Sequence, residues 1–281
     1  MSVYDSADDI LRFYLTDYTP FFTLQSDPRV SWCAYHPRSR RAGDDALVVA
    51  IHGTDRRAEG YRDRLAQFAE ENRCSVVAPL FPAGMANPLD LDSYKWVRDS
   101  GVAYDQLLLD VVDAAGEMFG LDTRRFLLHG FSGGGQFVHR FLLLHPDRVR
   151  AASIGAPGTV TLVDSQRDWW VGTRDMVERF GAGPERDELR RVAVHTVVGS
   201  QDTEVWEITM NPGDPRYVPD ANRAGADRRE RIASLADSLE SVGATVRRDV
   251  VEGADHDGFA ILEPVTVFFA DVLSGQWETS R

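Results

Sequence analysis

The sequence predicts an α/β protein with a mostly parallel sheet covered by helices on both faces. Three observations lead to this fold class. Short, continuous apolar runs such as 46–51 recur along the chain and suit strands that are buried on both faces. Segments with apolar residues at helical spacing lie between these runs. This alternation of strands with helices is typical of parallel sheets, in which a helix forms each crossover.

The individual elements follow from the same patterns, taken in order along the chain. Strands are expected where apolar runs are bounded by turn residues, and helices where apolar residues recur every three or four positions. The expected strands are 30–36, 46–51, 75–80, 126–129, 149–154, a buried run within 192–202, and a second buried run that begins at 245. The expected helices are 8–18, a segment around 61–69, 107–119, 136–144, 232–242 and 265–273.

Length and charge limit the classes of protein that the chain can belong to. A chain of 281 residues suits one large domain, residues 1–281, with a substantial core. The net charge of −13 argues against nucleic acid, anionic membrane surfaces and polyanionic substrates as partners. Lys95 is the only lysine among 31 basic residues, which indicates a coding bias toward arginine.

The N-terminal segment and the two cysteines indicate a cytoplasmic protein. Residues 1–18 alternate acidic and apolar side chains and lack the basic and apolar regions of a signal peptide. No apolar run is long enough to cross a bilayer. Cys33 and Cys74 have no metal-site or disulfide-framework spacing. We expect two reduced thiols, with a single bridge as the alternative.

Ser132 is the most informative position in the sequence. The apolar run 126–128 leads into Gly130-Phe131-Ser132-Gly133-Gly134, and a helical run follows from Gln136. This is strand, sharp turn and helix, with a serine at the apex and small residues two positions before and after it. The G-x-S-x-G pattern in this context is typical of a nucleophile elbow, which exposes a serine hydroxyl at the end of a strand.

Two further residues lie just past the ends of later expected strands. Asp202 follows the run that begins at 192, and His256 lies in the loop after the strand that begins at 245. Open parallel sheets place their ligand sites at the carboxyl ends of strands, so Ser132, Asp202 and His256 are expected to converge.

At these residues the chain resembles the α/β-hydrolase superfamily, over about 46–273. The matching pieces are Ile51-His52-Gly53-Thr54, the turn at Ser132, Gly199-Ser200-Gln201-Asp202 and Gly253-Ala254-Asp255-His256-Asp257-Gly258. The resemblance is closest to small single-domain esterases and to depolymerase-like or feruloyl-esterase-like members. It implies the α/β-hydrolase fold and a serine hydrolase.

The catalytic roles follow from the chemistry of each side chain. A serine hydroxyl needs a base to take its proton, and His256 has the loop position that suits this role. The base needs a carboxylate that orients it, and we expect Asp202 in that role. Glu204 is the nearest rival. Asp255 and Asp257 flank the histidine and are expected to be solvated, because a sequence-adjacent carboxylate usually points away from its neighbour.

The oxyanion of a tetrahedral intermediate needs preorganised N–H donors. One is expected to be the amide of Gly133, which follows the nucleophile and begins a helix. The resemblance implies that the backbone amide of Thr54 is the second. His52 is expected to support that loop.

Two long segments, 158–190 and 203–225, interrupt the strand–helix alternation on the expected catalytic side. Long excursions in compact domains are often functional, so we expect a small cap or lid rather than a second domain. Aromatic and apolar residues in these segments are candidates for an apolar substrate pocket, with packing within the cap as the alternative. The candidates are Trp169, Trp170, Met176 and Trp206.

The sequence therefore predicts a serine esterase that cleaves a carboxylic ester of an uncharged apolar or aromatic small molecule through an acyl-enzyme. An acyltransferase with the same triad and a non-catalytic hydrolase-fold binding protein are the alternatives. No cofactor and no metal are expected, because no cluster has metal-ligand spacing and no dinucleotide motif is present. The expected partner is a small ester, and assembly into a homo-oligomer is left open.

Overall fold

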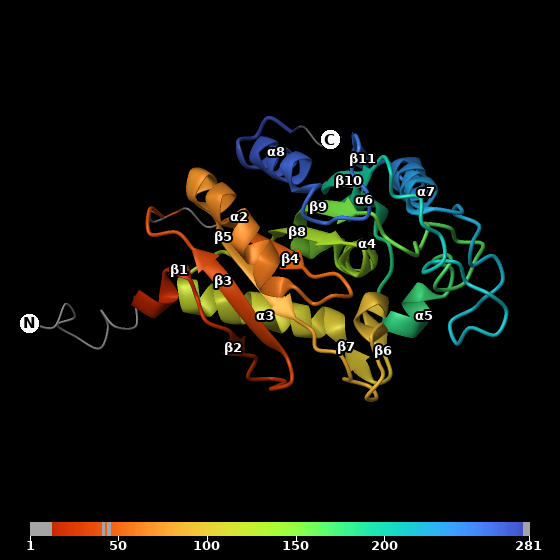
Figure 1. The fold of residues 1–281 in the computed structure, drawn as a ribbon, viewed down its shortest axis with the longest axis horizontal. Coiled ribbons are helices and arrows are strands. Elements are labelled where there is room, and N and C mark those ends of the chain that lie inside the picture. The colour runs from red at the N-terminus through yellow and green to blue at the C-terminus, as the bar shows by residue number, and fades with distance from the viewer. Residues whose placement is uncertain (1–12, 41–42, 44–45, 278–281) are drawn as a thin grey trace, which may run out of the picture.

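The structure, a computed structural model, describes residues 13–40, 43 and 46–277, and its centre is a nine-stranded, mostly parallel sheet (Figure 1). The strand order is β1-β3-β5-β4-β8-β9-β10-β11, and β2 pairs with β3. The strands are β1 (Asp17–Tyr18), β2 (Phe22–Thr23), β3 (Ser31–His36), β4 (Leu47–Ile51), β5 (Ser75–Leu80), β8 (Phe126–Phe131), β9 (Val149–Gly155), β10 (Ala193–Gly199) and β11 (Thr245–Val251). Pairs from β5 to β11 are parallel, whereas β1, β2 and β3 pair antiparallel.

Helices cover both faces of this sheet (Figure 1). On one face, α2 (Ala58–Asn72) and α8 (Leu262–Leu273) enclose one part of the core. On the other face, α3 (Tyr104–Phe119), α4 (Gly133–Leu144) and α7 (Arg228–Ser241) enclose a second part. The strands between them are apolar on both sides, as expected for a parallel sheet with two covered faces.

The edge strand β11 differs from the expectation of a second buried run. Its residues alternate between partly buried and exposed, and it pairs only with β10. Arg247, Arg248 and Asp249 lie in its middle, so the strand cannot have two apolar faces. Their charges reach water because an edge strand leaves one side open.

At the N-terminus, the expected helix 8–18 falls partly outside the described residues, because 8–12 are not among them. Residues 13–15 are helical, but Asp17–Tyr18 form β1, so the helix prediction is wrong at its end. Tyr18 stacks edge-on against Tyr35 of β3, with ring centroids 4.8 Å apart. Pairing with β3 makes residues 17–18 a strand, and the local sequence contains no pattern that predicts this pairing.

The segments 158–190 and 203–225 are largely irregular and contain only two short helices, α5 (Met176–Phe180) and α6 (Arg186–Leu189). They follow β9 and β10 and lie beside α7 on the right of Figure 1. Their role as a cap stays a prediction.

Both cysteines, Cys33 and Cys74, are buried and free, which excludes the bridge between them. Burial raises the pKa of Cys33 to about 11 and that of Cys74 to about 12, so both remain thiols at neutral pH. Among the helices of the described ranges, none is long and apolar enough to cross a membrane.

A small antiparallel ribbon and a one-turn helix follow the carboxyl end of β5. The 3-10 helix η1 (Ser93–Trp96) leads into β6 (Arg98–Asp99), which pairs with β7 (Val102–Ala103). Helix η1 packs against α4, so its side chains lie close to the residue that follows the turn at Ser132.

Candidate active site

Ser132 occupies the sharp turn between β8 and α4. Its φ of 55° and ψ of −114° lie in a region that costs a non-glycine residue about 1–3 kcal/mol. The neighbouring glycines allow the turn to close. A Cβ at Gly130 would lie 2.5 Å from the carbonyl of Gly134, and a Cβ at Gly134 would lie 2.3 Å from the carbonyl oxygen of Ile51. The motif therefore encodes a turn in which backbone packs directly on backbone.

The structure brings Ser132, His256 and Asp202 together from the ends of three strands. His256 Nε2 lies 2.9 Å from Ser132 Oγ, and His256 Nδ1 lies 2.6 Å from Asp202 Oδ2. Asp202 is 1% exposed and can only accept, so Nδ1 carries the proton and donates to it. The remaining nitrogen, Nε2, is then free to accept the proton of the Ser132 hydroxyl.

The rival carboxylates do not approach the histidine ring. Glu204, Asp255 and Asp257 are all exposed, whereas the Asp202 carboxylate is the one within hydrogen-bond distance of His256. The physical reason is the turn after β10. The N–H of Asp202 bonds to the carbonyl of Gly199 at 3.2 Å, which turns the Asp202 side chain inward, and Glu204 lies beyond that turn.

Gly133 and Thr54, the expected oxyanion donors, both lie close to Ser132. Gly133 is the first residue of α4, so its N–H has no acceptor within the helix. The Thr54 loop passes beside Ser132, because a Cβ on Gly53 would lie 3.9 Å from Ser132 Cβ. Thr54 Oγ1 is buried and has no hydrogen-bond partner among the described residues.

His52 holds this loop, as expected from the sequence. It is completely buried, and its Nε2 accepts the N–H of Phe81 at 3.0 Å. Its Nδ1 therefore carries the proton and donates to the carbonyl of Gly53 at 2.8 Å. Burial lowers the pKa of His52 to about 4, so the ring is neutral at neutral pH. A neutral ring with both nitrogens bonded sets the path of the chain into Thr54.

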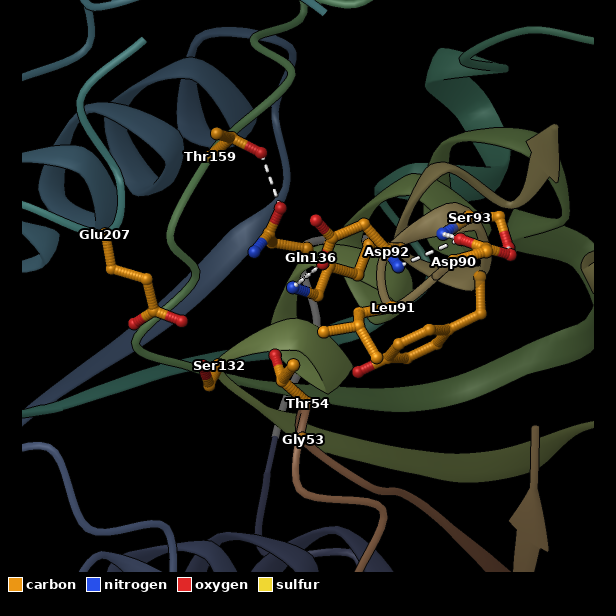
Figure 2. Close-up of polar contacts among 12 residues, drawn as sticks. Gly53, Thr54, Asp90, Leu91, Asp92, Ser93, Ser132, Gln136, Thr159 and Glu207 are labelled. Carbon is orange, nitrogen blue, oxygen red and sulfur yellow. Dashed lines mark hydrogen bonds and ion pairs between the residues drawn. The ribbon is translucent and has the colours of Figure 1, made fainter. Parts of the chain in front are cut away.

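A cavity of about 690 Å³ lies beside Ser132 and His256. Its wall is polar and charged rather than apolar. Arg57 and Arg64 stack over the ring of Phe259, with guanidinium carbons 4.5 and 3.6 Å from the ring centroid. Glu207 also lines the cavity, and Figure 2 shows its carboxylate directed toward the space near Ser132.

The structure does not bring the four candidate pocket residues to this cavity. Trp170 and Met176 are buried elsewhere, Trp169 is half-buried, and Trp206 is 77% exposed. The two adjacent rings pack around the buried guanidinium of Arg140, whose Cζ lies 5.8 Å from each ring centroid. These rings therefore make cation–π contacts inside the protein and do not line the cavity.

Several solved structures are similar to this chain. A poly(3-hydroxybutyrate) depolymerase from Bordetella parapertussis has a TM-score of 0.68 at 25% identity, over 86% of this chain and 84% of its own. A poly(aspartic acid) hydrolase-1 from Sphingomonas sp. KT-1 has a TM-score of 0.69 at 22% identity, over 90% and 98%. The chain has the α/β-hydrolase fold.

A third similar structure, the fluorophosphonate-binding serine hydrolase FphF from Staphylococcus aureus, has a TM-score of 0.58 at 13% identity, over 92% of this chain and 99% of its own. No protein-family model and no curated protein matches the sequence. The fold class predicted from the sequence is confirmed. As in other open parallel sheets, the hydrolase-fold site lies at the carboxyl ends of the strands.

Sequence reasoning missed Arg228, which lies behind Asp202. Its guanidinium is 2% exposed and lies 3.4 Å from Asp202 Oδ1, on the oxygen that His256 does not use. It also donates to Glu207 Oε2 at 2.7 Å and to the carbonyl of Glu204 at 3.2 Å. Arg228 thus links the acid to the cavity wall. It lies 26 residues beyond Asp202, at the start of α7, so no local pattern marks it.

Proposed function

We propose that this chain is a serine hydrolase that cleaves a carboxylic ester through an acyl-enzyme. The continuous hydrogen-bonded chain from Asp202 through His256 to Ser132 is the observation that carries the proposal. The similarity to depolymerases and serine hydrolases supports the same reaction class. In this proposal Ser132 is the nucleophile, His256 the base and Asp202 the acid that orients it.

The first half of the reaction forms the acyl-enzyme. Ser132 Oγ attacks the ester carbonyl while His256 Nε2 takes the hydroxyl proton. The carbonyl oxygen becomes an oxyanion, which the N–H groups of Gly133 and Thr54 stabilise. The intermediate collapses when the C–O bond to the alcohol breaks, and His256 donates its proton to the leaving alcohol oxygen.

The second half hydrolyses the acyl-enzyme by the same groups. Water loses a proton to His256 Nε2 as its oxygen attacks the acyl carbon, and the Ser132–acyl bond then breaks with return of the proton to Oγ. The predicted preference for an apolar or aromatic ester stays a prediction, since the cavity wall next to Ser132 is polar.

The test is covalent labelling by a fluorophosphonate, read by intact mass, together with turnover of p-nitrophenyl butyrate. We expect wild type to take one label. Ser132→Ala should take none and lose about 10⁴–10⁶ in turnover, because triad losses have this size. Its melting temperature should change little, because the substitution removes one partly buried hydroxyl and leaves no cavity.

A matched control is Ser274→Ala, an exposed serine after α8, which should label and turn over like wild type. Residual turnover above a few per cent in Ser132→Ala would remove this residue from the mechanism.

A further inference from the structure

A second group of polar side chains gathers beside Ser132 and has no role in the proposed reaction. Figure 2 shows the amide of Gln136 and the carboxylate of Glu207 directed toward the space above Ser132 and Thr54, with Asp92 approaching from the other side. These residues come from α4, from the segment after β10 and from the loop before η1. A wall assembled from three separate elements is a candidate for substrate binding.

Lys95, the only lysine of the chain, belongs to this group. It is 8% exposed, and its ammonium forms an ion pair with Asp92. Its stem packs on the residue that follows the nucleophile, because a Cβ on Gly133 would lie 2.8 Å from Lys95 Cε. Burying an ammonium beside the nucleophile costs free energy unless its N–H groups are used. The Asp92 carboxylate uses part of this hydrogen-bonding capacity.

Arg140 holds Lys95 and Gln136 in one rigid frame. Its buried guanidinium donates to the carbonyl of Lys95 at 2.7 Å and to Thr159 Oγ1 at 2.9 Å. Thr159 in turn donates to Gln136 Oε1 at 2.6 Å. Since the amide oxygen of Gln136 is already bonded, its Nε2–H₂ is the group left to donate. That nitrogen donates no hydrogen bond to another of the described residues.

The charged side chains of this group are paired. Lys95 is paired with Asp92, and Glu207 is paired with Arg228 at 2.7 Å. A carboxylate brought beside Lys95 would face both Asp92 and Glu207, and like charges at short range are unfavourable. An uncharged oxygen meets no such opposition, and it can accept from Lys95 and Gln136. A hydroxyl can also donate to Glu207.

We propose that Lys95 and Gln136 form a polar subsite that binds an uncharged oxygen substituent on the acyl group of the substrate. Lys95 is then a specificity-determining residue of the reaction assigned above, and this inference rests on that proposed function. The subsite selects acyl groups with a hydroxyl or carbonyl oxygen beyond the scissile carbonyl over plain alkyl chains and over carboxylate-bearing chains.

The test compares three p-nitrophenyl esters: 3-hydroxybutyrate, butyrate and the succinate half-ester. In Lys95→Met, which keeps the apolar stem, kcat/KM for the hydroxybutyrate should fall about 10–100-fold, since a hydrogen bond to a charged group contributes about 1.5–3 kcal/mol. The loss should appear mainly in KM. Turnover of butyrate should change less than about twofold. Gln136→Leu should lose the same discrimination more weakly, about 3–10-fold, because a neutral donor is removed.

The control is Arg124→Met, which also removes one positive charge but is exposed and precedes β8, at the opposite end of that strand from Ser132. It should leave all three rates unchanged. Equal losses for hydroxybutyrate and butyrate in folded Lys95→Met would overturn the inference, as would a loss largest for the succinate half-ester. Both outcomes leave the proposed hydrolase intact. Absence of turnover and of label in wild type would instead overturn the proposed function, and this inference with it.

Discussion

The turn at Ser132 and the irregular segments 158–190 and 203–225 lie at the same end of the sheet but are held in different ways. In the turn, contacts between neighbouring backbone atoms leave one conformation open, and glycines permit it. The irregular segments have few backbone hydrogen bonds of regular type. Turn hydrogen bonds within each segment satisfy many of its carbonyl groups. Long side chains from α4 and α7 bond to further hydroxyl and carbonyl groups of these segments.

Three buried arginines carry this second kind of support. Arg140 projects from α4, and Arg228 and Arg231 project from α7. Arg231 alone donates to the carbonyls of Gly158, Ile208 and Gly225. Each guanidinium has five N–H donors in a rigid fork, so one arginine side chain can hydrogen-bond to several separate stretches of irregular backbone.

The difference teaches where sequence motifs are reliable. A motif that restricts the backbone, such as the turn at Ser132, positions its side chain through the conformation of the turn itself, and its glycines allow the close contact with the backbone of Ile51. No backbone motif fixes the aromatic rings of the irregular segments. The Trp170 ring therefore packs against the Arg140 guanidinium and not in the cavity.

The largest expected effect tests the residue that the end of β10 positions, Asp202. Asp202→Asn should lower kcat by about 10⁴, because an amide at this position favours the wrong tautomer of His256. Glu204→Gln should change kcat less than about twofold, because the Glu204 side chain is exposed and only its backbone carbonyl is used. Steady-state kinetics on p-nitrophenyl butyrate checks both variants. If Glu204→Gln loses kcat and Asp202→Asn keeps it, Glu204 and not Asp202 is the acid.

The next effect tests whether buried arginines hold the irregular segments. Arg231→Met should lower the free energy of unfolding by about 3–5 kcal/mol, because it leaves several buried carbonyls without a donor. Arg229→Met, on the exposed side of the same helix, should stay within about 0.5 kcal/mol of wild type. Urea unfolding measures both. Equal stabilities of the two variants would show that the segments are held by other contacts.

Acid should weaken the sheet and its adjoining helix through neutral, buried histidines. Burial lowers the pKa of His52 to about 4 and those of His129 and His195 to about 3, and it lowers that of His139 well below its usual range. Below about pH 6.5 the unfolded chain binds protons that the folded chain does not, so the free energy of unfolding decreases as the pH falls.

Each such histidine contributes about 1.4 kcal/mol per pH unit in this range. Urea unfolding between pH 7 and pH 5 should show the decrease, and His129→Phe should reduce its slope by about one proton. A stability that is flat over this range would mean that these rings are not buried as neutral groups.

The smallest effect concerns the ring that the irregular segments leave in solvent. Trp206→Ala should change the free energy of unfolding by less than about 0.5 kcal/mol, because its side chain is 77% exposed. Trp170→Ala, which removes a buried ring over Arg140, is the contrasting variant and should cost about 3–5 kcal/mol while the ester preference stays as in wild type. A changed ester preference in Trp170→Ala would instead show that the Trp170 ring contributes to substrate binding.

The sequence by itself determined the alternation of strands and helices, the turn at Ser132 and the order of the three triad candidates. The physical reason is that these features depend on short-range restrictions. Apolar runs must be buried, glycine alone fits where a Cβ would touch backbone, and strand ends of a parallel sheet meet at one edge. The apolar runs and the glycine motif are visible in the local sequence, and the parallel order of the strands then brings Ser132, Asp202 and His256 together although they are far apart in the chain.

Only the tertiary structure decided which long side chains serve the site. Arg228 reaches Asp202 from 26 residues away, Lys95 meets Gly133 through the packing of η1 on α4, and Trp170 turns to Arg140. Long side chains have many rotamers, and their partners are chosen by buried charge and hydrogen bonding between elements far apart in sequence. These choices leave no periodic or local pattern, so the polar wall beside Ser132 became visible only in the folded chain.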